Sequence, residues 1–328
     1  MGVKTNPLEN NFVGPFSDLI MRFIELKISQ GYKYACQGHI LSKFSHLSFN
    51  HQIENCILSK ELVQDWRDKN SQVKSNTLAQ ALFPVRDFAL YLIDLGYEAH
   101  VPIIPRIPIS SFVPHIFTQD ELSRFFQCSD NIQQRNHYNS TMPIVFPVLF
   151  RMLFGCGLRI SEALNLKIGE VDLEEGILTI LKAKGNKDRF VPMSESLTKI
   201  CQAYVELIHA ELNANDFFFC MRNRKRLCET TIFERYKKVL QTCGIKHQGK
   251  GYGPRVHDFR HTYAVLSMRE SHRKGVDIYY FMPILSNYMG HENVYDTEKY
   301  IRLPTEFHSE VRNAVSKETE YIIPEVSI

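Results

Sequence analysis

A run of prolines limits how this chain can fold more than any other feature of its sequence. Four prolines fall within residues 100–114, at Pro102, Pro105, Pro108 and Pro114. Each proline fixes φ and lacks a backbone donor, so no long helix or central strand can pass through this segment. We therefore expect an extended linker over 101–116, with one folded part over 1–100 and another from 117 onward. A chain of 328 residues is long enough for two such parts.

The first part has the pattern of a small helical bundle. Leu78, Leu82 and Val85 recur at spacings of three and four, which predicts one apolar helix face. Ser75 is the expected N-cap of this helix, and Gly96 is its expected C-terminal stop. Two further helices are expected at 16–26 and 36–47.

The part after the linker has a mainly helical pattern interrupted by one hairpin. Thr118 and Glu121 form a capping box, which predicts a helix start. Residues 176–181 have strand composition, a Gly-Asn turn signal follows, and 189–192 is the expected return strand. Further helices are expected at 195–212, 230–242, 257–268 and 279–289. The predicted fold class is mainly α with a small β-hairpin, that is, α+β.

Composition excludes several classes of protein. The hydrophobic content of 44% and charged content of 23% are typical of soluble globular proteins. The N-terminus lacks the apolar core of a secretory signal, and the longest apolar stretch, 146–158, is interrupted by Arg151. We expect a cytoplasmic protein with no membrane partner. The eight cysteines include no Cys-x-x-Cys pair, which predicts buried free thiols and no metal, with a zinc-binding module as the alternative.

Positive charge is concentrated in one segment. The net charge is only +3, yet residues 221–261 carry eleven basic side chains against three acidic ones. Such a concentration is typical of a surface that contacts DNA phosphates. A solvated charged face would have the same composition, so the segment alone leaves both interpretations open.

Four short motifs carry the residues with catalytic chemistry. Gly-Cys-Gly-Leu-Arg-Ile-Ser-Glu begins at 155, and Lys-Ala-Lys-Gly-Asn-Lys-Asp-Arg-Phe-Val-Pro begins at 182. His-Asp-Phe-Arg-His follows at 257, and Tyr-Met-Gly-His at 288 precedes a further tyrosine nine positions after its histidine. In chain order these motifs supply Arg159 with Glu162, Lys184, His257 with Arg260, and His291 with Tyr300.

In this order and spacing, the motifs resemble the catalytic boxes of the phage-integrase, or tyrosine recombinase, family. The resemblance covers roughly 117–309 and, more loosely, the helical part before the linker. It implies a helical core-binding domain over 1–100 and a catalytic domain over 117–309. It also implies a site-specific recombinase or integrase that cleaves and rejoins DNA through a 3′-phosphotyrosine intermediate, without metal or nucleotide cofactor. The integration, excision or transposition of a mobile element would be its task.

The resemblance also implies partners and residue roles. Its partners would be double-stranded DNA at a specific site, three further copies in a tetramer on that DNA, and possible accessory proteins, all at the nucleoid. Position by position, it implies that Tyr300 is the nucleophile and Lys184 the general acid. Arg159 and Arg260 would clamp the phosphate, His257 would be the histidine of the His-x-x-Arg pair, and His291 would be the second catalytic histidine. Glu162 resembles the acidic residue that steadies this site from behind.

Phosphodiester chemistry explains why such residues would gather. Attack on the phosphorus builds negative charge on the non-bridging oxygens, which fixed cationic donors stabilise. Arginine suits this task because its planar fork can bind two phosphate oxygens and stays charged. A tyrosine with a pKa near 10 needs a base or a strong field before it attacks, and the departing 5′ oxygen needs a proton.

Several assignments have competitors. Lys182 and Lys187 lie on the same hairpin as Lys184, and Tyr288 and Tyr295 lie near Tyr300, which alone has the family spacing. His261 is interpreted as a structural, hydrogen-bonded histidine. Residues 269–274 are expected to form an extra loop before His291.

Weaker expectations concern DNA contact and assembly. The tail at 310–328 is expected to dock onto a neighbouring protomer. Candidate DNA contacts, for which a solvated face is equally consistent, are Lys74, Ser75, Thr77, Arg224, Lys225, Thr230, Arg235 and Lys238.

Two other functions remain open at this point. A topoisomerase or hairpin-forming telomere resolvase would share the chemistry and differ in its products. A DNA-binding regulator that no longer cuts would lack at least one catalytic residue, whereas every motif here is filled.

Overall fold

The computed structural model describes residues 6–51, 53, 56–72, 75–107, 113–131, 141–181, 188–209, 213–247, 249 and 253–300. The chain divides into two compact units, Met1–Ser111 and Phe112–Ile328. Each unit is described by itself.

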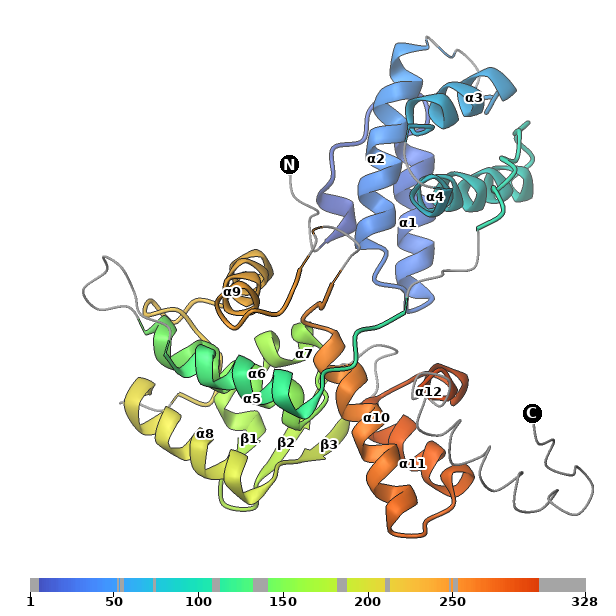
Figure 1. Ribbon diagram of the computed structural model, residues 1–328. Helices are drawn as coiled ribbons and strands as arrows, with labels where there is room; N and C mark the ends of the chain where they lie inside the picture. The colour runs from blue at the N-terminus through green and yellow to red at the C-terminus, as the bar shows by residue number, and fades with distance from the viewer. Residues whose placement is uncertain are drawn as a thin grey trace, which may run out of the picture. The chain divides into compact units, whose positions relative to one another are not determined.

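The first unit is a bundle of helices around an aromatic core (Figure 1). Phe23 packs against Phe88, and Phe44 meets Trp66 edge to face with ring centroids 5.5 Å apart. The Trp66 indole donates to the carbonyl of Ala81, so this large side chain is buried with its polar atom paired. The elements are η1 (Pro7–Glu9), α1 (Ser17–Ser29), α2 (Ala35–Asn50), α3 (Lys60–Lys69) and α4 (Ser75–Asp94).

The helices expected in this unit are confirmed, with differences at their ends. The helix predicted at 16–26 is α1, and the one predicted at 36–47 is α2. Helix α4 is described from Ser75 onward, and because 73–74 lie outside the described residues, Ser75 as its N-cap stays a prediction. Gly96 follows α4 with φ +84°, and its amide donates to the carbonyl of Ile93, as a C-terminal glycine stop requires.

The second unit combines helices with one small sheet. Its helices are α5 (Gln119–Asp130), α6 (Met142–Gly155), α7 (Ile160–Asn165), η2 (Ile168–Glu170), α8 (Glu195–Ile208), α9 (Glu229–Thr242), α10 (Asp258–Arg273), α11 (Ile278–Met289) and α12 (Tyr295–Glu298). Its strands are β1 (Val171–Asp172), β2 (Ile177–Ile180) and β3 (Arg189–Pro192). The capping box at Thr118 and Glu121 starts α5 as predicted. The mainly helical α+β class is confirmed.

The sheet is antiparallel in the order β1-β2-β3. The predicted hairpin is confirmed, with Leu178 opposite Val191 and both side chains buried. The sequence pattern missed the two-residue strand β1. Strand β3 also contacts α11. Arg189, the first residue of β3, therefore lies close to the end of α11.

Helix α6 is the centre of the larger core in this unit. It is apolar on nearly all sides and packs against α5, α8 and α10. Phe125 of α5 and Phe259 of α10 meet there with ring centroids 5.1 Å apart. The Arg151 side chain lies at the edge of this core, where its guanidinium forms a bidentate ion pair with Asp130. The core therefore fixes the first turn of α10, where two of the motif residues lie.

A second, smaller core joins α10 and α11 to Tyr300. These two helices lie side by side (Figure 1) and bury Met268, Leu285 and Met289 between them. Tyr300 belongs to the same cluster and is only 4% exposed. The candidate nucleophile is thus held by helix packing.

The extra loop expected at 269–274 is wrong. Helix α10 continues to Arg273 and ends at Lys274 and Gly275, whose φ is +75°. Lys274 pairs with Glu270 one turn earlier, and Ser271 is buried. The charged residues of this segment therefore continue the helix and face water, because their spacing fits a helix surface.

The described residues also show whether the chain has a membrane-spanning helix, disulfide bonds or a metal-binding cluster. No helix among them is long and apolar enough to cross a membrane. All eight cysteines are free, and the predicted burial is found for Cys156, Cys201, Cys220 and Cys243. No cluster of three or more His, Cys, Asp or Glu in these segments is placed to hold a metal ion.

Candidate active site

Arg159 and Glu162 are fixed together at the start of α7. Arg159 is the N-cap, and Glu162 Oε2 accepts its backbone N–H at 2.9 Å. The Arg159 guanidinium also donates from Nη1 to Glu162 Oε1 at 2.7 Å. The guanidinium is 19% exposed and the Glu162 side chain 6%, so the arginine alone of the pair has access to solvent.

Arg189, at the start of β3, binds the same carboxylate. Its Nη1 and Nη2 donate to Glu162 Oε1 and Oε2 at 3.0 and 2.8 Å. Burial opposes ionisation of Glu162, but the hydrogen bonds and charges of Arg189 and Arg159 outweigh it and lower the pKa of Glu162 to about 2. Glu162 is therefore ionised throughout the physiological range.

Three arginines from different elements bind three consecutive carbonyls at the end of α11. Arg189 Nε donates to Tyr288 O at 2.8 Å, and Arg159 Nη2 donates to Gly290 O at 2.7 Å. Between them, Arg260 Nη2 donates to Met289 O. A helix leaves its last carbonyls without intrahelical partners and carries partial negative charge there, which suits guanidinium groups. This arrangement fixes the chain just before His291.

Arg260 is the most buried of the three. Its side chain is 1% exposed and its Nη1 donates to Gly157 O at 2.7 Å. Gly157 has φ +59°, and a Cβ there would lie 2.7 Å from the ring of Tyr263, so only glycine fits at this turn. Burial and the nearby charge of Arg159 lower the pKa of Arg260 to about 10, which leaves it charged at neutral pH.

Three histidines surround this group of arginines. His257 caps α10 and is solvent-exposed, and its ring packs edge to face on His261. His291 Nδ1 lies 2.7 Å from Thr297 Oγ1. Partial loss of water around each ring, followed by the charge of Arg260, lowers the pKa of both His257 and His291 to about 4, although one side of the His257 ring remains open to solvent. Both are therefore neutral at pH 7 in the DNA-free protein.

Tyr300 lies among these groups. Its hydroxyl is 3.1 Å from His261 Nδ1, and its ring stacks on His291 with centroids 6.0 Å apart. Burial raises the pKa of Tyr300, while the charges of Arg260 and Arg159 act in the opposite direction. The phenol is thus protonated at neutral pH and has cationic groups beside it that stabilise its ionised form.

The structure brings most of the predicted catalytic residues together. Arg159, Glu162, Arg260, His291 and Tyr300 form one connected group. His257 joins it through its contact with His261. Lys184, with its competitors Lys182 and Lys187, lies outside the described residues. So do Lys74 and the tail at 310–328.

The sequence pattern did not identify Arg189 as a site residue. Arg189 stands within the second motif and the return strand, but neither feature reveals which buried carboxylate an arginine binds. His261 was interpreted as a structural histidine with a hydrogen bond. It does have such a bond, and the partner is Tyr300.

The predicted DNA contacts are spread over several surfaces. Ser75 and Thr77 are exposed at the start of α4 in the first unit. Arg224 pairs with Asp216, and Arg235 lies over the ring of Phe146 at 5.1 Å, so both already have protein partners. Three other predicted contacts are exposed: Lys225 on the turn after 221, and Thr230 and Lys238 on α9.

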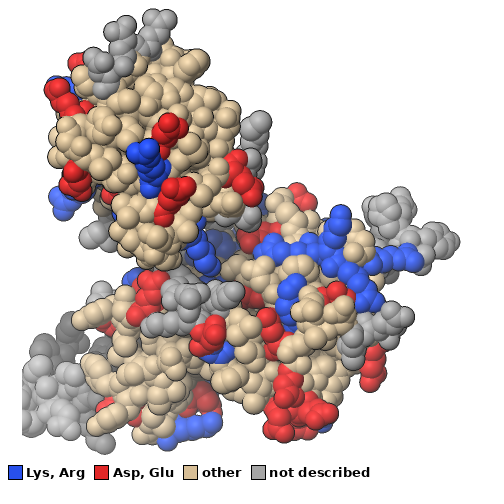
Figure 2. Space-filling view, turned by 180° about the vertical axis from the view of Figure 1, so that it is seen from behind, with Lys and Arg blue, Asp and Glu red and all other residues tan. Residues whose placement is uncertain are grey.

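Basic side chains gather over one face of the second unit. Figure 2 shows several Lys and Arg side chains gathered in a band there, with acidic side chains beside and below it. Exposed basic residues of 221–247 include Arg222, Lys225, Lys237, Lys238 and Lys246. Such a surface fits a polyanion more closely than a compact ligand.

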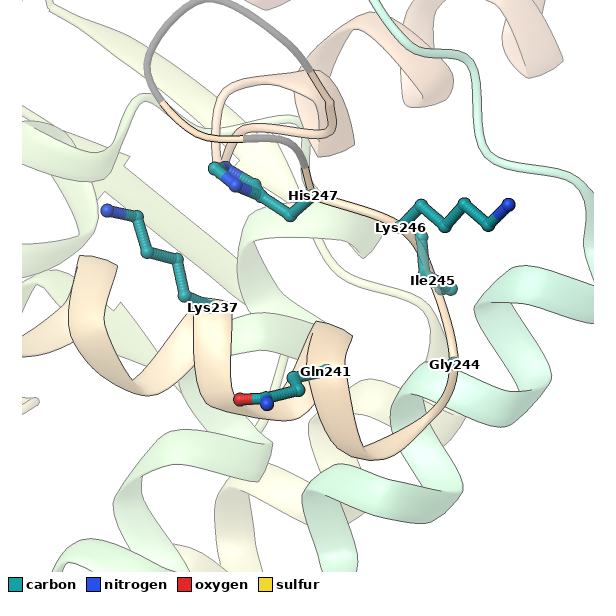
Figure 3. Close-up of a pocket in the computed structure, with 6 residues that line it drawn as sticks. All are labelled: Lys237, Gln241, Gly244, Ile245, Lys246 and His247. Atoms are coloured by element: carbon teal, nitrogen blue, oxygen red, sulfur yellow. The ribbon is translucent and has the colours of Figure 1, made fainter.

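A hollow beside the end of α9 belongs to this basic segment. It is lined by Lys237, Gln241, Gly244, Ile245, Lys246 and His247 (Figure 3). The two ammonium groups in Figure 3 point away from each other, so they do not converge on one anion. The hollow therefore extends a charged surface and does not form a separate pocket for a small molecule.

The arrangement is suited to one kind of chemistry. Three guanidinium groups share a single carboxylate, which leaves excess positive charge next to a buried phenol. Arg159 and His257 reach solvent, where a phosphate could approach. A nucleophilic hydroxyl beside a cationic phosphate site can form a covalent phosphoester bond.

Comparison with known proteins gives consistent matches. Residues 115–306 match the model of the "Phage integrase family", more than half of the chain. A putative integrase/recombinase of Sinorhizobium fredii is 26% identical over 310 residues, covering 93% of this chain and 98% of that protein. The tyrosine recombinase XerA of Pyrococcus horikoshii is 29% identical over 228 residues, covering 68% of this chain and 67% of that protein.

Solved structures share the fold. A lambda integrase dimer bound to a core site matches with a TM-score of 0.60 and 12% identity, covering 86% of this chain and 94% of that one. A XerH recombinase bound to its difH substrate matches with a TM-score of 0.57 and 18% identity, covering 94% and 90%. At these identities the likeness concerns the fold.

Proposed function

Because this chain belongs to the phage integrase family and is a tyrosine-type site-specific DNA recombinase, we propose that Tyr300 is its nucleophile and that the residues around it form its active site. The observation that carries this proposal is the position of the Tyr300 hydroxyl among His261, His291 and Arg260. Tyr288 and Tyr295 have no such surroundings, since Tyr288 stacks on Tyr263 and Tyr295 is 76% exposed.

The proposed reaction is an in-line transfer of a DNA phosphate to Tyr300. The phenolic oxygen forms a bond to phosphorus, the bond from phosphorus to the 5′ oxygen breaks, and a 3′-phosphotyrosine results. Lys184 gives the departing 5′ oxygen its proton. Resealing is the reverse reaction with a 5′ hydroxyl from another strand, and it needs no ATP because the phosphotyrosine bond retains the energy of the phosphodiester.

Arg159, Arg260, His257 and His291 are proposed to hold the phosphate. Cationic and neutral donors aimed at its non-bridging oxygens would offset the charge that develops during attack, a task that metal ions perform in other phosphoryl transfers. We propose that this site works without a metal or other cofactor. Glu162 contributes by fixing Arg159, to which it is bound through two separate hydrogen bonds.

Covalent trapping tests the assignment of Tyr300. The full chain is incubated with DNA from the regions that flank its own gene, and protein–DNA adducts are isolated and their ends mapped. Wild-type protein should leave a 3′-linked adduct at a defined position, with or without EDTA. Tyr300→Phe should bind the same DNA and form no adduct, whereas Tyr295→Phe should behave like wild type. An adduct with Tyr300→Phe, or loss of the wild-type adduct in EDTA, would contradict the proposal.

We further propose integration, excision or transposition of a mobile element as the biological role. The Tn1549 transposon integrase bound to a circular-intermediate DNA has the same fold, with a TM-score of 0.58, which is compatible with this role. The action would take place in the cytoplasm, at the nucleoid, on double-stranded DNA carrying the site. A substrate with two such sites separates recombination from topoisomerase or telomere-resolvase activity, because only recombination joins ends from different sites.

The assembly on DNA is proposed to be a homotetramer, which accessory proteins join in the cell. In it the first unit and the catalytic unit of each protomer would clamp one DNA site, with Lys74, Ser75 and Thr77 contacting DNA from the first. The tail at 310–328 would dock onto a neighbouring protomer. Removal of 310–328 should leave cleavage of a single site intact and abolish pairing of two sites in a gel-shift assay. Unchanged pairing would contradict the docking role.

A further inference from the structure

Among the described histidines, His261 is the one whose ring nitrogen lies at hydrogen-bond distance from the Tyr300 hydroxyl, to which the Arg260 guanidinium also hydrogen-bonds. His261 lies on α10 immediately after Arg260, and its Nδ1 is 3.1 Å from Tyr300 Oη. The ring is 15% exposed, so water has little access to this hydrogen bond. The family motifs gave His261 no catalytic role.

We propose that His261 is a catalytic residue that accepts the phenolic proton of Tyr300 as the oxygen attacks phosphorus. This inference rests on the proposed function of Tyr300 as the nucleophile. In the step, the proton of Tyr300 Oη moves to His261 Nδ1 and the Oη–P bond forms. The P–O5′ bond breaks at the same phosphorus, and the 5′ oxygen receives a proton from Lys184. When the strand is resealed, His261 returns its proton to Tyr300.

The tautomer that this role requires fits the surroundings of the ring. A Tyr300 hydroxyl that donates to Nδ1 leaves the ring proton on Nε2. His261 Nε2 lies 4.0 Å from Asp258 Oδ1, and Asp258 is completely buried. Asp258 is itself held by the Arg255 backbone at 2.8 Å and the Arg255 guanidinium at 3.1 Å. A fixed carboxylate on the far side of the ring stabilises the imidazolium that forms, as in other nucleophile–histidine–carboxylate arrangements.

The charge state of His261 before DNA binds is the one a proton acceptor needs. Burial, followed by the neighbouring His257, Arg255, Arg260 and His291, lowers the pKa of His261 to about 3. The ring is therefore neutral at pH 7 and has a free lone pair at Nδ1. A DNA phosphate bound by Arg159 and Arg260 brings negative charge close to the ring, which raises its affinity for a proton at the time of attack.

The other two histidines are placed for different tasks. His291 Nδ1 is occupied by the hydroxyl of Thr297 at 2.7 Å, and its ring lies face to face with Tyr300. His257 is exposed and touches the edge of the His261 ring. His257 and His291 can therefore donate to the phosphate, while His261 is the histidine whose Nδ1 lies at hydrogen-bond distance from the phenol.

The test measures the rate of covalent adduct formation on a nicked oligonucleotide that carries the cleavage site mapped above. His261→Asn retains a polar group near the position of Nδ1 but cannot take up a proton, and His261→Gln is a second variant in case the first is unstable. Both are compared with wild type between pH 6 and 9 after folding and DNA binding have been verified. His272→Asn, at an exposed position near the end of α10, is the matched control.

We expect adduct formation by the His261 variants to be about 10²–10⁴-fold slower than wild type at pH 7, the range typical of general base catalysis. The deficit should shrink as the pH rises, because hydroxide then removes the phenolic proton. A fluorinated tyrosine introduced at position 300, whose phenol is more acidic, should restore the variants at least tenfold. His272→Asn should match wild type.

The outcomes separate this inference from the proposed function. Variants within threefold of wild type at every pH, or slow variants that neither high pH nor fluorotyrosine improves, would overturn the role of His261 and leave Tyr300 as nucleophile. An adduct formed by Tyr300→Phe would instead overturn the proposed function itself.

Discussion

Glu162 is a buried carboxylate that holds two arginines of the candidate active site in place. Its two oxygens accept four hydrogen bonds from only two residues, since Arg159 donates from its backbone and its side chain and Arg189 from both ends of its guanidinium. The Glu162 side chain is only 6% exposed, so an unpaired negative charge there would have a large desolvation free energy, and the arginine donors offset it. The Glu162 carboxylate and the Arg159 guanidinium therefore stabilise each other in the folded protein.

The low pKa of Glu162 predicts a defined dependence of stability on pH. A carboxyl whose pKa falls from 4.5 when unfolded to about 2 when folded contributes stability above pH 4.5, which is lost as the pH falls toward 2. The contribution at neutral pH is on the order of 3 kcal/mol. In urea unfolding, Glu162→Gln should be much less stable than wild type at pH 7, and the gap should narrow steadily between pH 5 and pH 2.5.

A matched control distinguishes this effect from general acid destabilisation. Glu195 pairs with Lys199 on the surface of α8, and its side chain is 84% exposed. Glu195→Gln should change the free energy of unfolding by less than about 1 kcal/mol at any pH, because exposed ion pairs contribute little. A gap between wild type and Glu162→Gln that does not change with pH would mean that the Glu162 carboxyl is not ionised in the folded protein as described.

Among the elements, the C-terminus of α11 is the one on which the site is assembled. Its last three carbonyls are bound by side chains from β3, α10 and the start of α7. Gly290 ends the helix in the left-handed conformation, and a Cβ there would lie 2.8 Å from Arg189 Nη1. Three segments far apart in the chain are thereby held to the turn that carries His291.

Arg189 should therefore matter for activity although it has no proposed contact with DNA. Arg189→Met removes the partner of Tyr288 O and half of the support of Glu162, and breaking a buried ion pair typically costs about 3–5 kcal/mol. We expect a lower melting temperature and, in protein that remains folded, covalent adduct formation at least tenfold slower with DNA affinity nearly unchanged. Arg189→Lys should recover little of this, because an ammonium cannot bridge two oxygens as the guanidinium does.

Arg273→Met provides the control for that experiment. Arg273 is exposed at the last position of α10, so its loss should alter neither melting temperature nor adduct formation. If Arg189→Met formed adducts at the wild-type rate, the arginine would be a structural residue only, and the position of the α11 end would not govern the chemistry.

The elements that could be predicted from sequence are those whose signal is local. The capping box of α5 and the glycine after α4 depend on neighbouring residues, and both were identified correctly. The end of α10 was missed because the charged residues after Met268 looked like a loop, although ion pairs one turn apart suit a helix. The carboxylate partner of Arg189 could not be inferred, because it depends on the pairing of β3 with the rest of the fold.

The same difference between local sequence signals and contacts that depend on the whole fold applies to the candidate site. The motifs identified Arg159, Arg260, His291 and Tyr300 as residues that should converge, and they lie together. What no motif spacing reveals is which histidine nitrogen faces the phenol, since that depends on how α10 is rotated against the cluster of Met268, Met289 and Tyr300. If α10 were rotated by one residue, a neighbour of His261 would face the Tyr300 hydroxyl in its place.

At the scale of the whole molecule, the distribution of charge matters more than its sum. The net charge of +3 suggests only weak attraction to DNA, yet several exposed lysines and arginines of 221–247 gather in a band on one face of the second unit (Figure 2). A polyanion responds to the local field within about one Debye length, roughly 8–10 Å at ordinary ionic strength, and not to acids farther away. The protein should thus bind DNA as a much more basic molecule would.

This charge distribution predicts a steep dependence of DNA affinity on salt, to which Lys237, Lys238 and Lys246 contribute. Each phosphate contact adds about −0.9 to the slope of log K against log salt concentration. Replacing all three lysines with Gln should reduce the magnitude of the slope by up to about 3 and weaken binding most at low salt, as measured by fluorescence anisotropy. Lys199→Gln should leave the slope unchanged, because that lysine is paired with Glu195 on α8. If the triple variant had the wild-type slope, the basic band would be a solvated face, and DNA would have to be held by other residues.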